Sequence, residues 1–402
     1  MKLSKKIFTG FGGAVSGAAF LMASSAIGPG FLTQTAKFTE ELKASFGFII
    51  IISILLDIAV QLNIWRIIAV SELRVQDIAN RVTPGLGYFI AALIALGGLV
   101  FNIGNMGGCG MGLQILTGIE PGAGALISAV IALAIFWYRE AGKLMDSIVK
   151  VLGFGMIALT VYVVYTSRPP LNEAIYRSVW PEATDIMKII TLVGGTVGGY
   201  ISFAGAHRLL DAGIKGKNAL GVVNKSAVSG ILVTSLMRYI LFLAALGVVW
   251  QGAALGNENP AGEVFHLAAG KPGHIFFGIV LWSAAITSVI GASYTSVSFW
   301  KTLHPFVRNN EKIIITVFIL ISTAIFGFAG NPVTLLIVAG AFNGIILPIS
   351  LAVILIAASR RTVMGEYYHP FWMRMTGWIV VIIMSWMSII TIKENITTFL
   401  NR

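Results

Sequence analysis

Residues 18–38 have the sequence AAFLMASSAIGPGFLTQTAKF, an apolar stretch that is interrupted at its middle by Gly28, Pro29 and Gly30. Proline removes a backbone donor and clashes with the preceding helical turn, and glycine lets the backbone unwind. A regular helix should therefore not continue through this point. The stretch predicts a membrane helix that is broken near the middle of the bilayer.

A second interrupted stretch, ITLVGGTVGGYISFAGAHRLLDAG, covers residues 190–213 and has four glycines clustered at its centre. Five predicted spans lie between the start of the first interrupted span and the start of the second. Because five is an odd number, the second set of five enters the membrane from the opposite side. This pattern predicts an inverted repeat with discontinuous helices in corresponding positions, as in many secondary transporters. The alternative is that the glycines only allow helices to pack closely.

The composition places the whole chain in a lipid environment. Of 402 residues, 56% are hydrophobic and only 11% are charged, and the mean hydropathy is +0.86. A soluble domain has about 25% charged residues, so this chain could not cover itself with a wettable surface. The sequence leaves no room for a sizeable soluble domain.

Eleven stretches are long and apolar enough to cross a bilayer, which takes roughly 20 residues each. We expect one transmembrane transporter domain over residues 1–402, with repeat one at about 11–166, repeat two at about 184–358, and an extra helix at about 374–396. The predicted spans are 11–35, 46–70, 84–117, 122–138, 147–166, 184–211, 222–250, 274–302, 311–329, 332–358 and 374–396.

The net charge of +11 comes from basic residues in short connectors and not from one block or stripe. Most of the 28 lysines and arginines fall in connectors on the side of the N-terminus. The positive-inside rule then predicts a multi-pass protein of the cell inner (cytoplasmic) membrane, with the N-terminus inside and the C-terminus outside. The charged segment 72–81 is expected to be a solvated inner loop. We expect lipid and a small-molecule substrate as partners, with no nucleic acid and no obligatory protein partner.

Four motifs resemble the NRAMP family of divalent-metal transporters, and the resemblance extends over most of the chain. They are Gly28-Pro29-Gly30, the run from Leu55 to Arg66 that includes Gln61, the GGTV stretch at Gly194–Val197, and NGIILP at Asn343–Pro348. The resemblance implies an all-α polytopic LeuT-type fold: a 5+5 inverted repeat with broken helices 1 and 6, plus an eleventh helix. It also implies a transporter, and no P-loop or catalytic motif indicates a pump or an enzyme.

The chain departs from the family at the metal-binding residues. The family has Asp-Pro-Gly-Asn in the first helix, whereas this chain has Gly28-Pro29-Gly30-Phe31. In the sixth helix the family has Met-Pro-His after Gly-Ala-Thr-Val, whereas this chain has Gly198-Gly199-Tyr200. A dehydrated dication needs oxygen, nitrogen or sulfur ligands and a compensating charge, and these are missing. We therefore predict no metal site.

The same positions predict a site for a small organic solute, such as a carboxylate or an amino-acid derivative. Replacing the family's acid and amide leaves backbone N–H groups at the breaks, and small residues leave volume for a solute of several atoms. The alternative is a proton-coupled transporter of divalent metal ions such as Mn²⁺ or Mg²⁺, as in the family. The candidate substrate-binding residues are Ser25, Gly28, Pro29, Gly30, Phe31, Gln34, Gly195, Thr196, Gly198, Gly199 and Tyr200.

Four further residues are candidates for coupling transport to an ion. Asp57 and Arg238 lie within predicted spans, where charges are costly and often mark a pathway, although each could instead pair with a neighbour. His207 could relay a proton or cap a helix, and Asn102 could line a vestibule or join helices. We predict no cofactor. The coupling ion is H⁺ or Na⁺, and the sequence does not choose between them.

Overall fold

The computed structural model describes residues 28–400, with the side chains of 139–150 and 394–400 left aside. Within this part of the chain every regular element is helical. The elements are α2 (Pro29–Leu42), η1 (Lys43–Ser45), α3 (Phe46–Ser71), α4 (Val75–Val82), α5 (Leu86–Thr117), α6 (Pro121–Trp137), α7 (Arg139–Ser167), α8 (Leu171–Val179), α9 (Ile186–Thr196), α10 (Tyr200–Asp211), η2 (Lys217–Ala219), α11 (Leu220–Trp250), α12 (Pro260–Lys301), α13 (Pro305–Asn309), α14 (Glu311–Ala329), α15 (Pro332–Ala357), α16 (Arg361–Met364) and α17 (Phe371–Leu400).

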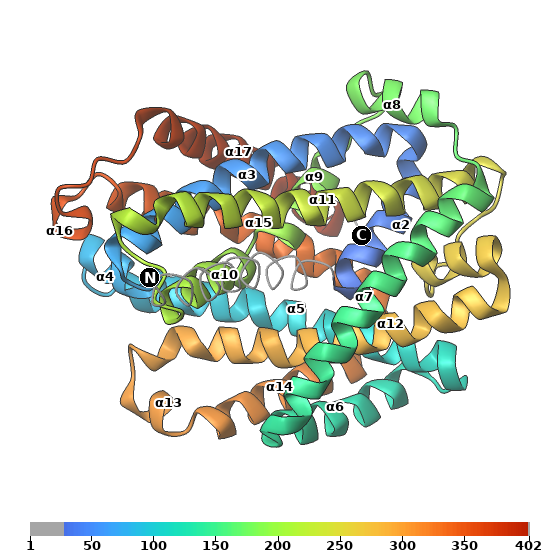
Figure 1. Ribbon diagram of the computed structural model, residues 1–402, viewed down its shortest axis with the longest axis horizontal. Coiled ribbons are helices and arrows are strands. Elements are labelled where there is room, and N and C mark those ends of the chain that lie inside the picture. The colour runs from blue at the N-terminus through green and yellow to red at the C-terminus, as the bar shows by residue number, and fades with distance from the viewer. Residues whose placement is uncertain (1–27, 401–402) are drawn as a thin grey trace, which may run out of the picture.

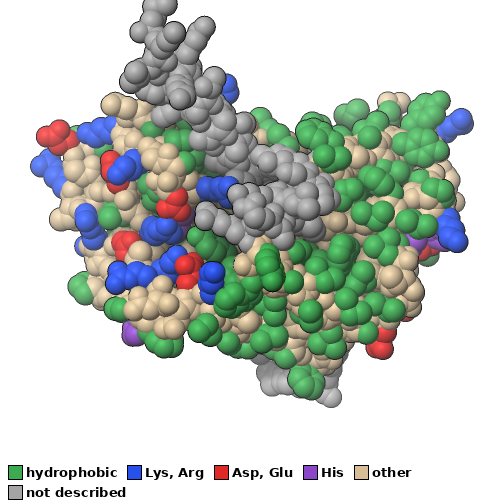
Figure 2. Space-filling model, turned by 60° about the horizontal axis from the view of Figure 1, so that its bottom comes forward, with side chains coloured by type: hydrophobic (Ala, Val, Ile, Leu, Met, Phe, Trp, Pro, Cys, Tyr) green, Lys and Arg blue, Asp and Glu red, His purple; other side chains and the backbone are tan. Residues whose placement is uncertain are grey.

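The long helices run along the longest axis of the molecule, and short helices lie at its two ends (Figure 1). Helices α4, α13 and α16 lie at one end and α8 at the other, so connectors alternate between the ends as they do in a multi-pass protein. Figure 2 shows Lys and Arg side chains gathered at one end, beside a broad hydrophobic surface. The molecule has the polarity of a membrane protein.

Each of the eleven predicted spans has a helical counterpart among the described residues, although the first is described only from residue 28. Eight helical stretches are long and apolar enough to cross a membrane. A ninth candidate is the bent pair of Val151–Ser167 and Leu171–Val179. The apolar helix Pro121–Trp137 is shorter. One of the eight, Pro29–Ser71, has 43 residues. At 1.5 Å per residue it would be roughly 65 Å long, about twice the bilayer core, so it contains two spans. Lys43, with φ 48°, separates them.

Three connectors differ from the sequence prediction. The segment 72–81, predicted to be a loop, is mostly helix α4, because Val75, Ile78 and Val82 are spaced to bury one helical face. Helix α8 occupies the connector after residue 167. Helix α12 begins at Pro260 rather than near 274, with non-helical Gly270 at φ 63° dividing it.

The broken helix α9–α10 lies at the centre of the fold. The most apolar part of this broken helix is 94% buried within the protein. The most apolar part of Glu311–Ala329 is only 28% buried and faces outward. Helices α3 and α15 pack against α9, and α3 also packs against α10. The second interruption in the sequence therefore lies in the most enclosed part of the molecule.

Candidate functional site

The first break lies at the start of α2. Gly28 is the N-cap, with extended backbone (φ −109°, ψ −173°), and Pro29 is the first helical residue. Gly28 has no side chain that could cap this end, and the backbone N–H groups of the first turn have no intrahelical acceptor. The start of α2 thus presents the positive end of a half-helix at the break. Ser25 lies outside the described residues.

The second break separates α9 from α10. Helix α9 ends at Thr196, and α10 begins at Tyr200 after Gly199, whose φ of 53° is in the left-handed region. Only glycine adopts this conformation without strain, which explains the residue at this position. No side chain caps the start of α10. The second predicted interruption is therefore present as a break between two helices, whereas at the first the described residues show only where α2 begins.

The glycines of the second break face α15 and leave no free volume there. A Cβ on Gly194 would overlap the backbone of Gly340 and Gly344, and one on Gly199 would overlap the side chain of Asn343. A Cβ on Gly198 would lie 2.8 Å from the Asn343 carbonyl oxygen. The sequence predicts that small residues at the breaks, such as Gly28 and Gly198, leave volume for a solute; beside Gly198 that volume is occupied by α15.

Gly28 is surrounded by neutral polar side chains. A Cβ there would lie 3.4 Å from Ser288 Oγ on α12 and 3.9 Å from Asn105 Oδ1 on α5, which is ordinary van der Waals contact. The neighbouring Pro29 packs against Gly108, whose missing side chain makes room for the proline ring. Among the described residues no group of three His, Cys, Asp or Glu side chains could hold a metal ion. We call Gly28, Asn105 and Ser288 the neutral cluster.

Gln34 connects α2 to α15 and lies beside α9. Its Nε2 donates to the carbonyl of Leu336 on α15 at 3.0 Å. Its Oε1 is buried and has no hydrogen-bond partner in the described part of the chain. The Cβ that Gly195 lacks would lie 3.0 Å from this oxygen, and a Cβ on Gly30 would be 3.7 Å from Gln34 Nε2. Gly195 and Gly30 thus accommodate the glutamine side chain.

Charged side chains lie against α2 and the end of α9. Arg238 on α11 donates from Nη1 to Thr196 Oγ1 at 2.9 Å, and its Cζ lies 4.3 Å from the centroid of the Phe31 ring. Asp57 on α3 is buried nearby, within the electrostatic influence of the Arg238 charge. We call Phe31, Asp57, Thr196 and Arg238 the charged cluster.

The charged side chains of this cluster are buried, and some of their polar atoms have no hydrogen-bond partner in the described part of the chain. Arg238 is 2% exposed and Asp57 is 1% exposed. Arg238 Nε and Nη2 and Asp57 Oδ1 have no hydrogen-bond partner within residues 28–400. The sequence left open whether Asp57 and Arg238 pair. The ion pairs among the described residues do not include one between these two side chains, and Arg238 is instead hydrogen-bonded to Thr196, a contact that no local pattern in the sequence indicates.

Two side chains of α10, Tyr200 and His207, contact residues of other helices. The Tyr200 ring meets Phe101 edge to face, with centroids 5.7 Å apart. His207 Nε2 accepts a hydrogen bond from the backbone N–H of Val75 at 3.2 Å, and its ring lies 5.1 Å from that of Phe299. His207 therefore caps α4, the second of its two interpretations, whereas its role as a proton relay stays a prediction.

Asn102 joins three helices. Its Nδ2 donates at 3.0 Å both to Ser293 on α12 and to Ser322 on α14. This is the helix-to-helix contact that the sequence analysis considered beside a vestibule position. Its Oδ1 is buried and finds no partner in the described chain.

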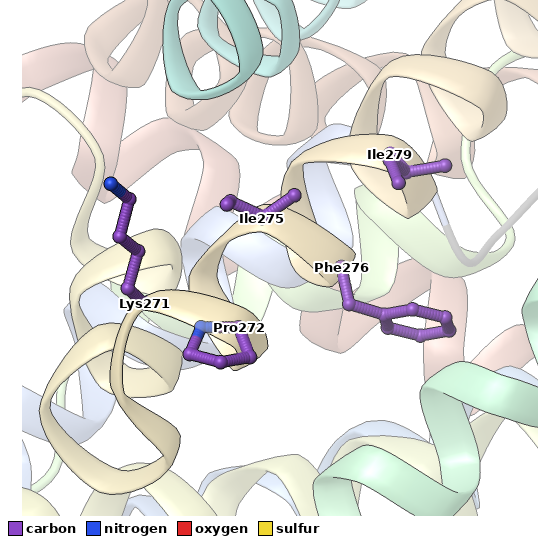
Figure 3. A pocket seen from close by; sticks show the side chains of 5 residues that line it. All are labelled: Lys271, Pro272, Ile275, Phe276 and Ile279. Carbon is purple, nitrogen blue, oxygen red and sulfur yellow. The ribbon is translucent and has the colours of Figure 1, made fainter.

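One surface hollow lies away from both breaks. It measures about 470 Å³ and is lined by Lys271, Pro272, Ile275, Phe276 and Ile279 on one side of α12 (Figure 3). At 1.5 Å per residue, Ile279 is roughly 14 Å along the helix from Ser288 of the neutral cluster. The mostly apolar lining suits contact with lipid, so we place the functional site at the breaks.

Two broken helices around a central polar site define a membrane transporter of the LeuT type. The family model "Natural resistance-associated macrophage protein-like" matches residues 19–394, and the chain belongs to this NRAMP family. An uncharacterized membrane protein of Bacillus subtilis is 60% identical over 94% of this chain and 93% of its own. One of Haemophilus influenzae is 56% identical over 96% and 97%.

Solved structures show the same fold. The manganese transporter of Eremococcus coleocola superposes with a TM-score of 0.75 at 17% identity, over 96% of this chain and 87% of the other. MhsT in complex with L-phenylalanine superposes with a TM-score of 0.64 at 14% identity, over 93% and 97%. Identities this low show the fold alone, and that fold is the predicted LeuT-type architecture.

Proposed function

We propose that this protein is a secondary active transporter of a small organic solute that has a carboxylate group, such as an amino-acid derivative. The observation that supports it is the combination of two retained helix breaks with the loss of every metal-binding side chain of the family pattern. Gly28 stands where the family has its aspartate, and its polar neighbours Asn105 and Ser288 are neutral.

A dehydrated metal ion would be poorly compensated at these breaks. Transfer of an ion from water into a low-dielectric interior costs several kcal/mol or more unless opposite charge is close. Asp57 is the acidic side chain beside the breaks, and it already faces the positive charge of Arg238. The cluster as a whole thus has no net negative charge to offer a dication.

A carboxylate would find complementary groups. The starts of α2 and α10 are uncapped, positive helix ends. Arg238 has two N–H groups without acceptors in the described chain, and guanidinium groups bind carboxylates in a forked geometry. Phe31 offers an apolar wall. The fold suits such a ligand, since the similar MhsT structure contains L-phenylalanine.

We propose that H⁺ or Na⁺ drives this transport. Asp57 is the candidate for proton uptake, and the Ser288 hydroxyl beside Gly28 is a candidate for sodium. We place the protein in the inner membrane with its basic end, which contains α4, α13 and α16, on the inside.

The test is a thermal-shift screen of the purified protein against acetate, benzoate, L-proline, L-phenylalanine, MnCl₂ and MgCl₂. A ligand that binds the folded state raises the melting temperature by mass action, by an amount that grows with its concentration. We expect a saturable shift with at least one carboxylate and none with either metal. A saturable shift with Mn²⁺ or Mg²⁺ alone would favour metal transport as in the family's known members and overturn the proposal.

A further inference from the structure

The first part of α12 folds back on the rest of the helix at Gly270. This residue has a φ of 63°, outside the helical region. His274 Nδ1 lies 3.0 Å from the carbonyl oxygen of Gly262, which comes 12 residues earlier. In a continuous helix the two residues would be roughly 18 Å apart along the axis. The chain therefore turns sharply at Gly270, and Lys271 begins the second, longer part of α12.

Lys271 lies at the level of the lipid headgroups. From Lys271 to Lys301, the last residue of α12, the helix is roughly 45 Å long, about the thickness of a bilayer with its headgroup layers. At one end Lys301 is paired with Glu311 at 2.7 Å. At the other end Lys271 is exposed and has no ion pair among the described residues, and Glu263, the acidic residue of α12, lies 4.0 Å from His266. The charge of Lys271 is thus available to an anion at the membrane surface.

The apolar hollow described above runs from Lys271 into the hydrocarbon. Ile275 and Ile279 follow Lys271 at intervals of one helical turn, so the three side chains lie along one side of α12 (Figure 3). Ile279 is roughly 12 Å below Lys271, deeper than the headgroup layer. Phe276 packs against α7, where a Cβ on Gly155 would lie 2.6 Å from the Phe276 ring. The hollow therefore combines a charged end with an apolar length.

The surface around the hollow points to a membrane component as its occupant. Ile275 and Ile279 are 39% and 37% exposed, and α7, which packs against this part of α12, exposes Phe154 and Ile157. A surface of this kind faces hydrocarbon, where phospholipid reaches it by lateral diffusion. The lysine favours a headgroup with net negative charge, and the backbone N–H groups at the start of this half-helix favour a phosphate.

We propose that this hollow is a binding site for one anionic phospholipid. The phosphate of the headgroup lies at Lys271, and one acyl chain lies along Ile275 and Ile279. The bound lipid covers the apolar lining and contacts the helix just below the turn at Gly270. Because the site is separate from both helix breaks, its occupancy does not depend on which solute the protein transports.

The experiment uses purified full-length protein from which lipid has been removed in detergent. Three probes are added in turn: dioleoylphosphatidylglycerol, dioleoylphosphatidylcholine, which has the same chains without net charge, and inorganic phosphate, which has charge without chains. Native mass spectrometry counts bound lipid, and melting curves report binding to the folded state. We expect one phosphatidylglycerol bound with a saturable rise in melting temperature, at least threefold weaker binding of phosphatidylcholine, and no effect of phosphate.

Variants at exposed positions locate the site. K271Q should weaken phosphatidylglycerol by about fivefold, as expected for one lysine at an anionic lipid surface, and leave phosphatidylcholine unchanged. The matched control K225Q removes another exposed lysine, on α11, and should bind as the wild type does. I275S/I279S should weaken both lipids, because it removes apolar contact while Lys271 stays. Without lipid, all three variants should melt as the wild type does.

Each of the other outcomes would overturn the proposal. Equal binding of the two lipids, or no binding of either, would show that the hollow does not select an anionic headgroup. Unchanged phosphatidylglycerol binding by K271Q, or an equal loss in K225Q, would place the lipid elsewhere on the protein. A rise in melting temperature with phosphate alone would show that Lys271 belongs to a site for a free anion.

Discussion

The two polar clusters on either side of α2 differ in charge and in how well their side chains are satisfied. The neutral cluster places Ser288 and Asn105 in ordinary contact distance of Gly28. The charged cluster buries Arg238 and Asp57 with donors and an acceptor unmet in the described chain. The position of the family's aspartate, Gly28, thus has neutral neighbours, whereas the buried guanidinium lies beside Phe31, the position of the family's asparagine. We infer that recognition has moved from the break itself to α11.

The comparison is tested most severely by removing the guanidinium. R238Q removes the positive charge that acts on buried Asp57, and leaving a buried charge uncompensated costs about 3–5 kcal/mol. We expect a clear loss of thermal stability together with the loss of carboxylate binding. Melting curves with and without ligand measure both effects. The double variant D57N/R238Q should regain most of the stability but none of the binding; a double variant as unstable as R238Q would show that the two residues do not act as a pair.

A second test restores charge to the neutral cluster. The variant G28D/F31N recreates the acid and amide of the family's first-helix motif. Ser288 Oγ lies 3.4 Å from the position of the new Cβ, so a side chain fits with only a small shift of its neighbour. We expect a Mn²⁺-dependent rise in melting temperature that the wild type does not show. The matched control G28N/F31N provides no carboxylate and should give no such rise.

A third test concerns pH, because protonation elsewhere in the chain must be separated from that of Asp57. Burial, with the nearby charges of Arg66 and Arg374, lowers the pKa of His369 to about 4, whereas an unfolded histidine has a pKa near 6.5. The unfolded chain therefore binds the proton first. The stabilising contribution of neutral His369 is complete above pH 6.5 and is lost as the pH falls toward 4.

We expect the melting temperature of H369Q to fall less steeply than that of the wild type between pH 6.5 and 4. Carboxylate binding should be unchanged in this variant, because His369 is hydrogen-bonded to Asn63 and lies outside both clusters. Identical pH slopes in the two proteins would mean that the burial of His369 does not contribute.

The smallest effect should come from the neutral cluster itself. S288A removes one hydroxyl near Gly28, and a single neutral contact contributes about 1 kcal/mol or less. Under proton coupling we expect carboxylate binding to change by less than fivefold, and uptake into liposomes to be independent of sodium. A sodium-dependent uptake that S288A abolishes would place the coupling ion in the neutral cluster and contradict proton coupling.

Sequence patterns predicted the parts of the structure that depend on local chemistry. Eleven apolar stretches of sufficient length and two clusters of Gly and Pro within them were enough to locate the spans and the broken helices. The amphipathic helix α4 was missed, because its charged residues hid the apolar spacing of Val75, Ile78 and Val82. That α15 packs into the space beside Gly198 and Gly199 could not be predicted, because α15 lies far away in the sequence.

The sequence by itself determined that the chain spans the membrane, that two spans are broken, and that the metal ligands of its family are absent. Each of these follows from residue type and short-range spacing. Only the tertiary structure decided which polar groups meet: it brings Arg238 on α11 to the hydroxyl of Thr196 on α9 and to the ring of Phe31 on α2. Helix packing sets such distances, and the pattern within one helix contains no information about the residue it will face.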